Sequence, residues 1–173
     1  GIEEIGLDYN FTLASGTMGP DGHVSKGGEA FGVVDTPEYR AMNPNGTVPT
    51  IDDDGFTLWE SNVIVRYLSM KYAAEKMYGD DIQTFASASR WMDWEQSKFL
   101  PEQHILVMNL VRLPPEERNP DEVEEARASL LTPLGIIEEQ LSRTEFIAAN
   151  HFTMGDIPIG MRVHRWFLFD LES

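Results

Sequence analysis

The segment from Thr50 to Trp59 limits the possible folds more than any other part of the sequence. It contains two short strand-like stretches separated by Asp54-Gly55. Asp-Gly at such a position is among the strongest short-range signals for a β-hairpin, because the favoured two-residue turns need positive φ angles at their central residues. We therefore expect two antiparallel strands, the second of which covers Phe56 to Trp59.

A helix is expected directly after this hairpin. Ile64, Tyr67 and Leu68 are spaced by three and four residues, which places them on one apolar face. Ser61 precedes them, and serine is a preferred residue at the cap of such a helix.

Two further elements are expected upstream of the hairpin. Residues 1–7 have the pattern of the last turns of a helix that ends at Gly6, so the chain is expected to begin inside an element. Tyr9 to Leu13 alternates apolar with polar residues, as a half-buried strand does. The glycine-rich stretch from Ser15 to Gly32 is expected to be a loop.

The second half of the chain has a helical pattern throughout. Phe85, Ala88, Met92 and Phe99 mark one face of a long helix, which Pro101 is expected to bend or break. A second helix is indicated by six apolar residues that recur every three or four positions: Val123, Ala126, Leu130, Leu134, Ile137 and Leu141. We therefore predict two domains, residues 1–76 with strands and helices and residues 77–173 with helices alone.

The last predicted helix has an unusually complete start signal. Thr153 and Asp156 have the spacing of a capping box, in which each side chain satisfies a backbone N–H of the other residue. We interpret this pair as a folding device and not as catalytic. Because apolar residues follow on most sides of the helix, we expect it to be buried centrally.

Composition excludes several classes of function. The 29 acidic residues against 13 basic ones give a net charge of −16, which disfavours binding to nucleic acid. Cysteine is absent, and the four histidines are scattered without metal-ligand spacing, so we expect no metal. No apolar run approaches the length that spans a bilayer, and a soluble protein without membrane contact is expected.

The first candidate binding residues are Val48 and Pro49. A proline at the start of a strand cannot donate to the sheet, and it keeps the preceding residue extended. The backbone N–H and C=O of Val48 are then free to pair with a peptide, and the bond before Pro49 is a plausible cis peptide. Taken alone, Pro49 is equally compatible with an ordinary turn proline.

The second candidates are Glu60 and Ser61, at the junction of strand and helix. A helix start offers unpaired N–H groups and the positive end of the helix dipole, so Ser61 can bind a carboxylate there. Glu60 can bind an ammonium group of the same ligand. In isolation, a simple helix cap at Ser61 and a solvent-facing Glu60 are the more common arrangement. The short hairpin, however, brings this pair and Val48 to the same edge of the sheet.

Four segments of the sequence, in order, resemble signatures of cytosolic glutathione transferases, particularly bacterial theta-like ones. They are Thr36-Pro37-Glu38-Tyr39, Asn43-Pro44-Asn45-Gly46-Thr47-Val48-Pro49, Leu58-Trp59-Glu60-Ser61-Asn62 and Phe152-Thr153-Met154-Gly155-Asp156-Ile157-Pro158. The resemblance implies a fold of α/β plus all-α class, with a thioredoxin-like N-terminal domain followed by a C-terminal helical bundle.

The resemblance also implies the function and the site. Val48 would pair with the cysteinyl part of glutathione beside a cis Pro49, and Glu60 and Ser61 would hold its γ-glutamyl head. A cytoplasmic homodimeric enzyme of detoxification is implied, which conjugates the glutathione thiolate to hydrophobic electrophiles. The family's sulfur-activating residue lies on or just after a first strand, which we expect upstream of Gly1, so the thioredoxin-like domain is expected to be incomplete and the C-terminal end truncated.

Two questions stay open at the level of sequence. Trp91 and Trp94 could line the pocket for the second substrate, but aromatic residues at helical spacing more often form core or subunit interface. A non-catalytic protein-assembly module and a glutathione-dependent reductase, dehalogenase or isomerase remain alternatives to the conjugating enzyme.

Overall fold

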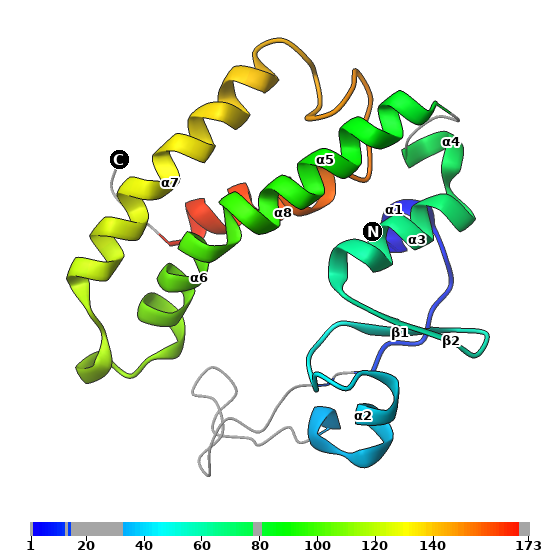
Figure 1. The fold of residues 1–173 in the computed structure, drawn as a ribbon, viewed down its shortest axis with the longest axis horizontal. Coiled ribbons are helices and arrows are strands. Elements are labelled where there is room, and N and C mark those ends of the chain that lie inside the picture. Colours follow the sequence, from blue (N-terminus) through cyan, green and yellow to red (C-terminus); the bar gives the residue numbers. More distant parts are fainter. Residues whose placement is uncertain (1, 13, 15–32, 78–80, 170–173) are drawn as a thin grey trace. The chain divides into compact units, whose positions relative to one another are not determined.

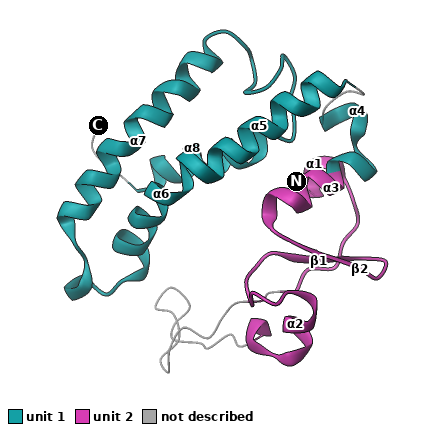
Figure 2. Ribbon diagram, in the orientation of Figure 1, with its two compact units in different colours: residues 1, 69–173 teal, residues 2–68 magenta. Residues whose placement is uncertain are grey.

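The computed structural model describes residues 2–12, 14, 33–77 and 81–169 (Figure 1). They belong to two compact units, residues 2–68 and residues 69–173 together with Gly1 (Figure 2). The units divide between Leu68 and Ser69, and the domain boundary between residues 76 and 77 stays a prediction. Most of the glycine-rich stretch, residues 15–32, lies outside the described residues.

The first unit is organised around a β-hairpin. Strands β1 (Thr50–Asp53) and β2 (Phe56–Trp59) pair antiparallel, with Thr50 opposite Trp59 and Asp53 opposite Phe56. The turn residues Asp54 and Gly55 have φ angles of 54° and 88°, as a tight hairpin with the right twist requires. The predicted hairpin is therefore confirmed.

Among the described residues of this unit, three helical segments precede the hairpin along the chain, and one helix follows it. They are α1 (Ile2–Ile5), the 3-10 turn η2 (Val33–Asp35), α2 (Pro37–Met42) and α3 (Ser61–Tyr72). Helix α1 ends as predicted, because Gly6 has a φ of 77° and its N–H bonds to the carbonyl of Ile2 at 3.0 Å. Helix α3 begins at Ser61 itself, so the serine expected as its cap is the first helical residue, and the carbonyl of the preceding Glu60 accepts the first helical hydrogen bond.

The strand predicted from Tyr9 to Leu13 is wrong over its described residues. Residues 9–12 have no strand structure, and Tyr9 and Phe11 are 51% and 77% exposed. A strand needs a neighbour to complete its hydrogen bonds, and the sheet of the described residues contains only β1 and β2. The alternating pattern alone could not provide that neighbour.

The second unit is helical, as predicted. It contains α4 (Ala74–Met77), α5 (Ile82–Lys98), α6 (Leu100–Val107), the π-helical turn η3 (Met108–Arg112), the 3-10 turn η4 (Pro115–Glu117), α7 (Pro120–Leu141) and α8 (Asp156–Leu168). The expected break before Pro101 falls at Phe99, which ends α5 and precedes α6. No helix in the described part is long and apolar enough to cross a bilayer.

The core of this unit lies between α5, α6, α7 and α8. Its buried members are Trp91, Phe99, Leu106, Ala126, Leu130, Ile137, Ile147 and Ile159. A buried polar link crosses this core, because Glu95 of α5 is 1% exposed and pairs with Arg162 of α8. Gln103 of α6 joins it by donating to the Arg162 carbonyl at 2.8 Å.

Helix α8 differs from the central burial expected of it. Pro158 and Ile159 are buried, but Met161, Phe167 and Leu168 are 53%, 75% and 67% exposed. Helices α5 and α6 pack against it closely. Val163 and Trp166 also pack, partly buried, against the core, so the exposed apolar residues occupy only part of the helix surface.

Candidate functional site

The open end of the hairpin brings the predicted binding residues together. Thr50 pairs with Trp59, so the residues next along the chain, Val48-Pro49 on one side and Glu60-Ser61 on the other, leave the hairpin at the same end. The Val48–Pro49 peptide bond is cis, and Val48 is 56% exposed. Within the part of the chain that the structure describes, neither backbone polar group of Val48 forms a hydrogen bond.

The start of α3 is also open. Glu60 has a φ of 74°, and its carbonyl accepts the first helical hydrogen bond from the Ile64 N–H at 2.9 Å. Glu60 and Ser61 are exposed, and the Ser61 hydroxyl forms no hydrogen bond among the described residues. The first N–H groups of a helix lack intrahelical acceptors, so this end suits a carboxylate ligand.

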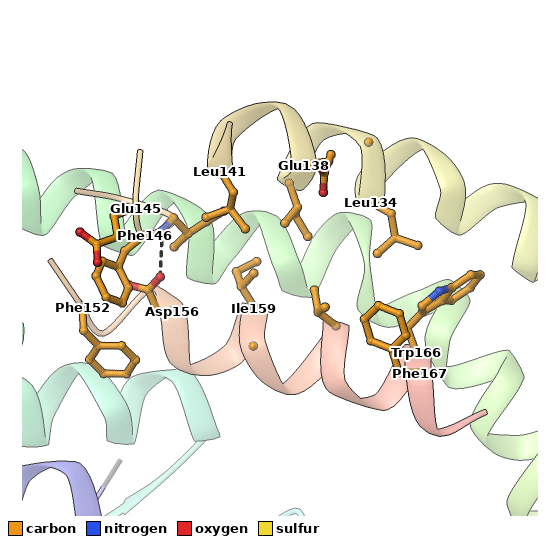
Figure 3. A pocket seen from close by; sticks show the side chains of 15 residues that line it. Leu134, Glu138, Leu141, Glu145, Phe146, Phe152, Asp156, Ile159, Trp166 and Phe167 are labelled. Atoms are coloured by element: carbon orange, nitrogen blue, oxygen red, sulfur yellow. Dashed lines mark hydrogen bonds between the residues drawn. The ribbon is translucent and has the colours of Figure 1, made fainter. Parts of the chain in front are cut away.

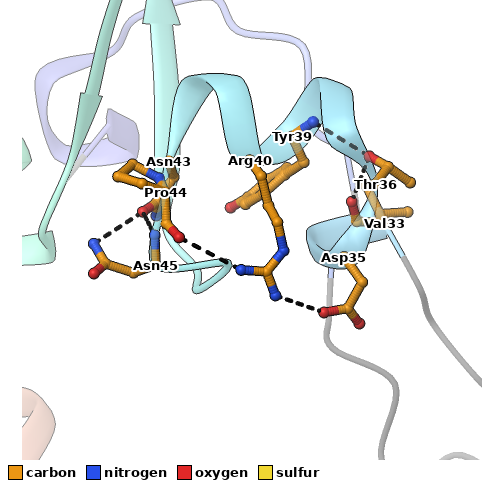
Figure 4. A network of polar contacts seen from close by, with 8 residues as sticks. All are labelled: Val33, Asp35, Thr36, Tyr39, Arg40, Asn43, Pro44 and Asn45. Carbon is orange, nitrogen blue, oxygen red and sulfur yellow. Dashed lines mark hydrogen bonds and ion pairs between the residues drawn. The ribbon is translucent and has the colours of Figure 1, made fainter.

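Helix α2 carries a polar network that positions the loop before the site (Figure 4). Thr36 caps α2 by accepting from the Tyr39 N–H at 3.2 Å. Arg40 donates to Asp35 at 3.1 Å and to the Pro44 carbonyl at 3.4 Å. Gly46 has a φ of 62°, a backbone conformation that favours glycine, whereas a Cβ there would meet only the end of the flexible Arg40 side chain, at 2.9 Å.

Two buried residues of this network were not assigned a role from the sequence. Tyr39 and Asn43 are 7% and 1% exposed, and both donate to the Thr47 carbonyl at 2.8 Å. The available signal was an asparagine followed by proline at a helix end, which indicates a turn. Which distant groups the side chain would bind could not be read from that signal.

The start of α8 is closed by its own side chains. The Asp156 carboxylate accepts from the Thr153 N–H and hydroxyl, both at 2.8 Å, and from the Ile147 N–H at 2.8 Å. The Asp156 N–H donates to the Thr153 carbonyl at 3.1 Å, so the Thr153 hydroxyl is a donor here and not the acceptor that the reciprocal pattern expects. All three of these hydrogen bonds to the Asp156 carboxylate come from groups of the protein itself.

A groove of about 700 Å³ lies between α7, α8 and the segment that connects them (Figure 3). Phe146 and Phe152 lie at one end, and Trp166 and Phe167 at the other. Its lining is mostly apolar, and its acidic members are Glu138, Glu145 and the internally bonded Asp156. The groove therefore lacks the set of converging polar groups that a zwitterion requires.

The two tryptophans considered for the second substrate lie in or against the core. Trp91 is 7% exposed, and Trp94 packs against the same cluster with its ring 5.1 Å from that of Trp91. This placement favours the core alternative. A role for either residue in substrate binding stays a prediction.

Comparison with known proteins identifies the class to which this fold belongs. Residues 2–70 match the family model of the glutathione S-transferase N-terminal domain. The solved theta class glutathione S-transferase of Xanthomonas axonopodis pv. citri, with glutathione bound, is 36% identical with a TM-score of 0.86, over 99% of this chain and 76% of that one.

Curated relatives agree with this class. Glutathione S-transferase GstB of Escherichia coli K12 is 32% identical over 168 residues, which are 96% of this chain and 74% of that protein. Glutathione S-transferase 3 of Zea mays is 34% identical over 125 residues, or 69% and 55% of the two chains. The chain belongs to the glutathione S-transferase family, with that family's thioredoxin-like N-terminal and helical C-terminal parts.

Proposed function

We propose that the protein is a glutathione transferase that binds glutathione at the open end of the hairpin. Val48 pairs through its backbone with the cysteinyl residue of the tripeptide. Glu60 accepts from the γ-glutamyl ammonium group, and the Ser61 hydroxyl and N–H donate to the γ-glutamyl carboxylate. The observation that carries the proposal is that Val48, whose backbone forms no hydrogen bond among the described residues, and the open start of α3 lie at the same end of one hairpin.

The chemistry of the ligand fits these groups. Glutathione has a peptide backbone that can form strand-like hydrogen bonds, and a head that carries both an ammonium and a carboxylate. Charge-assisted hydrogen bonds are the strong ones, and the acidic and donor groups lie adjacent at Glu60 and Ser61. The bound thiol loses its proton to solvent, and the sulfur then forms a bond to an electrophilic atom with its electron pair while the leaving group departs with the pair of the bond that breaks.

We extend the proposal to a hydrophobic electrophile as second substrate and to a cytoplasmic homodimer. These rest on the family alone. We propose no residue among the described ones for the activation of the glutathione sulfur.

Replacement of Glu60 tests the head-group site. Glu60→Gln removes the negative charge but keeps the size of the side chain, and we expect the Kd for glutathione to rise about tenfold or more in calorimetric titration. Glu75→Gln, an exposed carboxylate on α4, makes the same charge change as a control and is expected to leave the Kd unchanged.

A ligand variant makes this test more specific. With a glutathione analogue that lacks the amino group, Glu60→Gln and the unchanged protein are expected to bind equally, since the ammonium partner is gone. Equal binding of glutathione itself by both proteins would contradict the assignment of Glu60.

A further inference from the structure

Tyr39 and Asn43 surround the loop that contains Val48 and Pro49. The Thr47 carbonyl accepts from the Tyr39 hydroxyl and from the Asn43 amide, each at 2.8 Å. The Thr50 hydroxyl bonds to the same two side chains, at 2.8 Å to the Tyr39 oxygen and 3.1 Å to the Asn43 amide nitrogen. Thr47 and Thr50 are therefore each bonded to both buried side chains.

The bonds to Thr47 and Thr50 fix both ends of the segment that contains Val48 and Pro49, and they do not use the backbone groups of Val48. Val48 and Pro49 lie between Thr47 and Thr50, and the Val48 N–H and C=O are unbonded within the described residues. The remaining polar atom of Asn43, its Oδ1, accepts from the backbone and side-chain nitrogens of Asn45, both at 3.1 Å. The Asn43 side chain thus has bonds on both of its polar atoms while it is only 1% exposed.

Such an arrangement matters for binding because an ordered loop loses less conformational entropy when a ligand pairs with it. A free segment before a proline would have to be fixed at the moment of binding, at a cost in affinity. The anchors at Thr47 and Thr50 fix it beforehand.

We propose that Tyr39 and Asn43 are positioning residues for glutathione, which hold the Val48 backbone ready to pair with the cysteinyl part of the tripeptide. This inference rests on the proposed glutathione site. It assigns the two residues to affinity for glutathione and not only to the stability of the hairpin.

Tyr39→Phe tests the inference with a small change. It removes only the hydroxyl and keeps the buried ring. Tyr67→Phe is the matched control, because the Tyr67 hydroxyl donates to Asp53 at 2.6 Å near the turn of the same hairpin, at the end opposite the site. Both variants lose one hydroxyl with the hydrogen bonds that it forms, which for Tyr39 are the bonds to Thr47 and Thr50.

We expect Tyr39→Phe to raise the Kd for glutathione about five- to tenfold in calorimetric titration, and Tyr67→Phe to leave it within about twofold. Amide exchange of Val48, followed by NMR, gives a local readout. Saturating glutathione is expected to protect this amide strongly in the unchanged protein and in Tyr67→Phe, and clearly less in Tyr39→Phe.

Asn43→Asp provides a second variant of nearly the same shape. It keeps an acceptor for Asn45 but replaces the amide donor with a carboxylate oxygen that faces the Thr47 carbonyl, so an increase in Kd of about tenfold or more is expected. If Tyr39→Phe binds glutathione like the unchanged protein, or if Tyr67→Phe weakens binding as much, the inference is overturned and the glutathione site stands. If the unchanged protein binds no glutathione, both fall.

Discussion

The starts of helices α3 and α8 have similar residues and opposite character. Each has a hydroxyl residue and a carboxylate close to the first turn, Ser61 with Glu60 and Thr153 with Asp156. At α8 the carboxylate accepts three hydrogen bonds from the protein itself, and Thr153 is fully buried. At α3 both side chains are exposed and unbonded among the described residues. The same pair of residue types therefore serves the fold where its bonds are internal, and is available to a ligand where they are not.

The largest effect is expected when the closed helix start is opened. Asp156→Ala removes the acceptor of the Thr153 and Ile147 N–H groups, which then lie buried without partners. We expect the free energy of unfolding in urea to fall by about 2–4 kcal/mol. Asp121→Ala, which removes an exposed carboxylate in the first turn of α7, is expected to cost less than about 1 kcal/mol. Equal losses would show that the Asp156 bonds have no special importance.

A smaller effect is expected from the contact between α8 and α5. A side chain at Gly155 would lie 3.0 Å from the Ala88 carbonyl oxygen and 3.1 Å from its Cα, so Gly155→Ala forces backbone apart and is expected to cost about 1–3 kcal/mol in the same assay. Gly160→Ala, one turn further along α8 in open space, is expected to stabilise by up to about 1 kcal/mol. Effects of the same sign would contradict this packing.

The smallest effect is expected at a third helix start, that of α5. The exposed side chain of Asp81 caps this helix by accepting from the N–H groups of Gln83 and Thr84. The pKa of Asp81 is lowered, first by the Thr84 hydroxyl and then by the N–H groups of Gln83 and Thr84. A lowered pKa in the folded state means that the contribution is present at pH above about 4 and is lost as pH falls through the folded value. The difference in urea midpoint between the unchanged protein and Asp81→Ala is therefore expected to be small at pH 7 and to disappear towards pH 2. A difference that grows in acid would be inconsistent with this sign.

Local signals in the sequence predicted the features that depend on neighbouring residues. Asp54-Gly55 predicted the hairpin and its turn, and the apolar spacing from Val123 to Leu141 predicted helix α7. These elements are determined by turn geometry and by helical periodicity, both of which are visible within a few residues.

Features that depend on distant partners were not accessible in the same way. The alternation from Tyr9 to Leu13 predicted a strand, but a strand exists only beside a partner that the pattern cannot name. Likewise, the Asn43 amide bonds to Thr47 and Thr50 through the fold of the loop, and the Ile147 N–H reaches Asp156 across nine residues. The proposed binding residues were predicted from local patterns and family resemblance, whereas the hydrogen bonds around their loop required the structure.

Replacement of Ser61 by alanine is the most direct test of the contrast between the two helix starts. The measurement combines the Kd for glutathione with the free energy of unfolding of the same protein. We expect Ser61→Ala to raise the Kd about tenfold or more and to change the unfolding free energy by less than about 0.5 kcal/mol, since its hydroxyl bonds to nothing in the described fold. An unchanged Kd, or a loss of stability comparable with that of Asp156→Ala, would contradict the account.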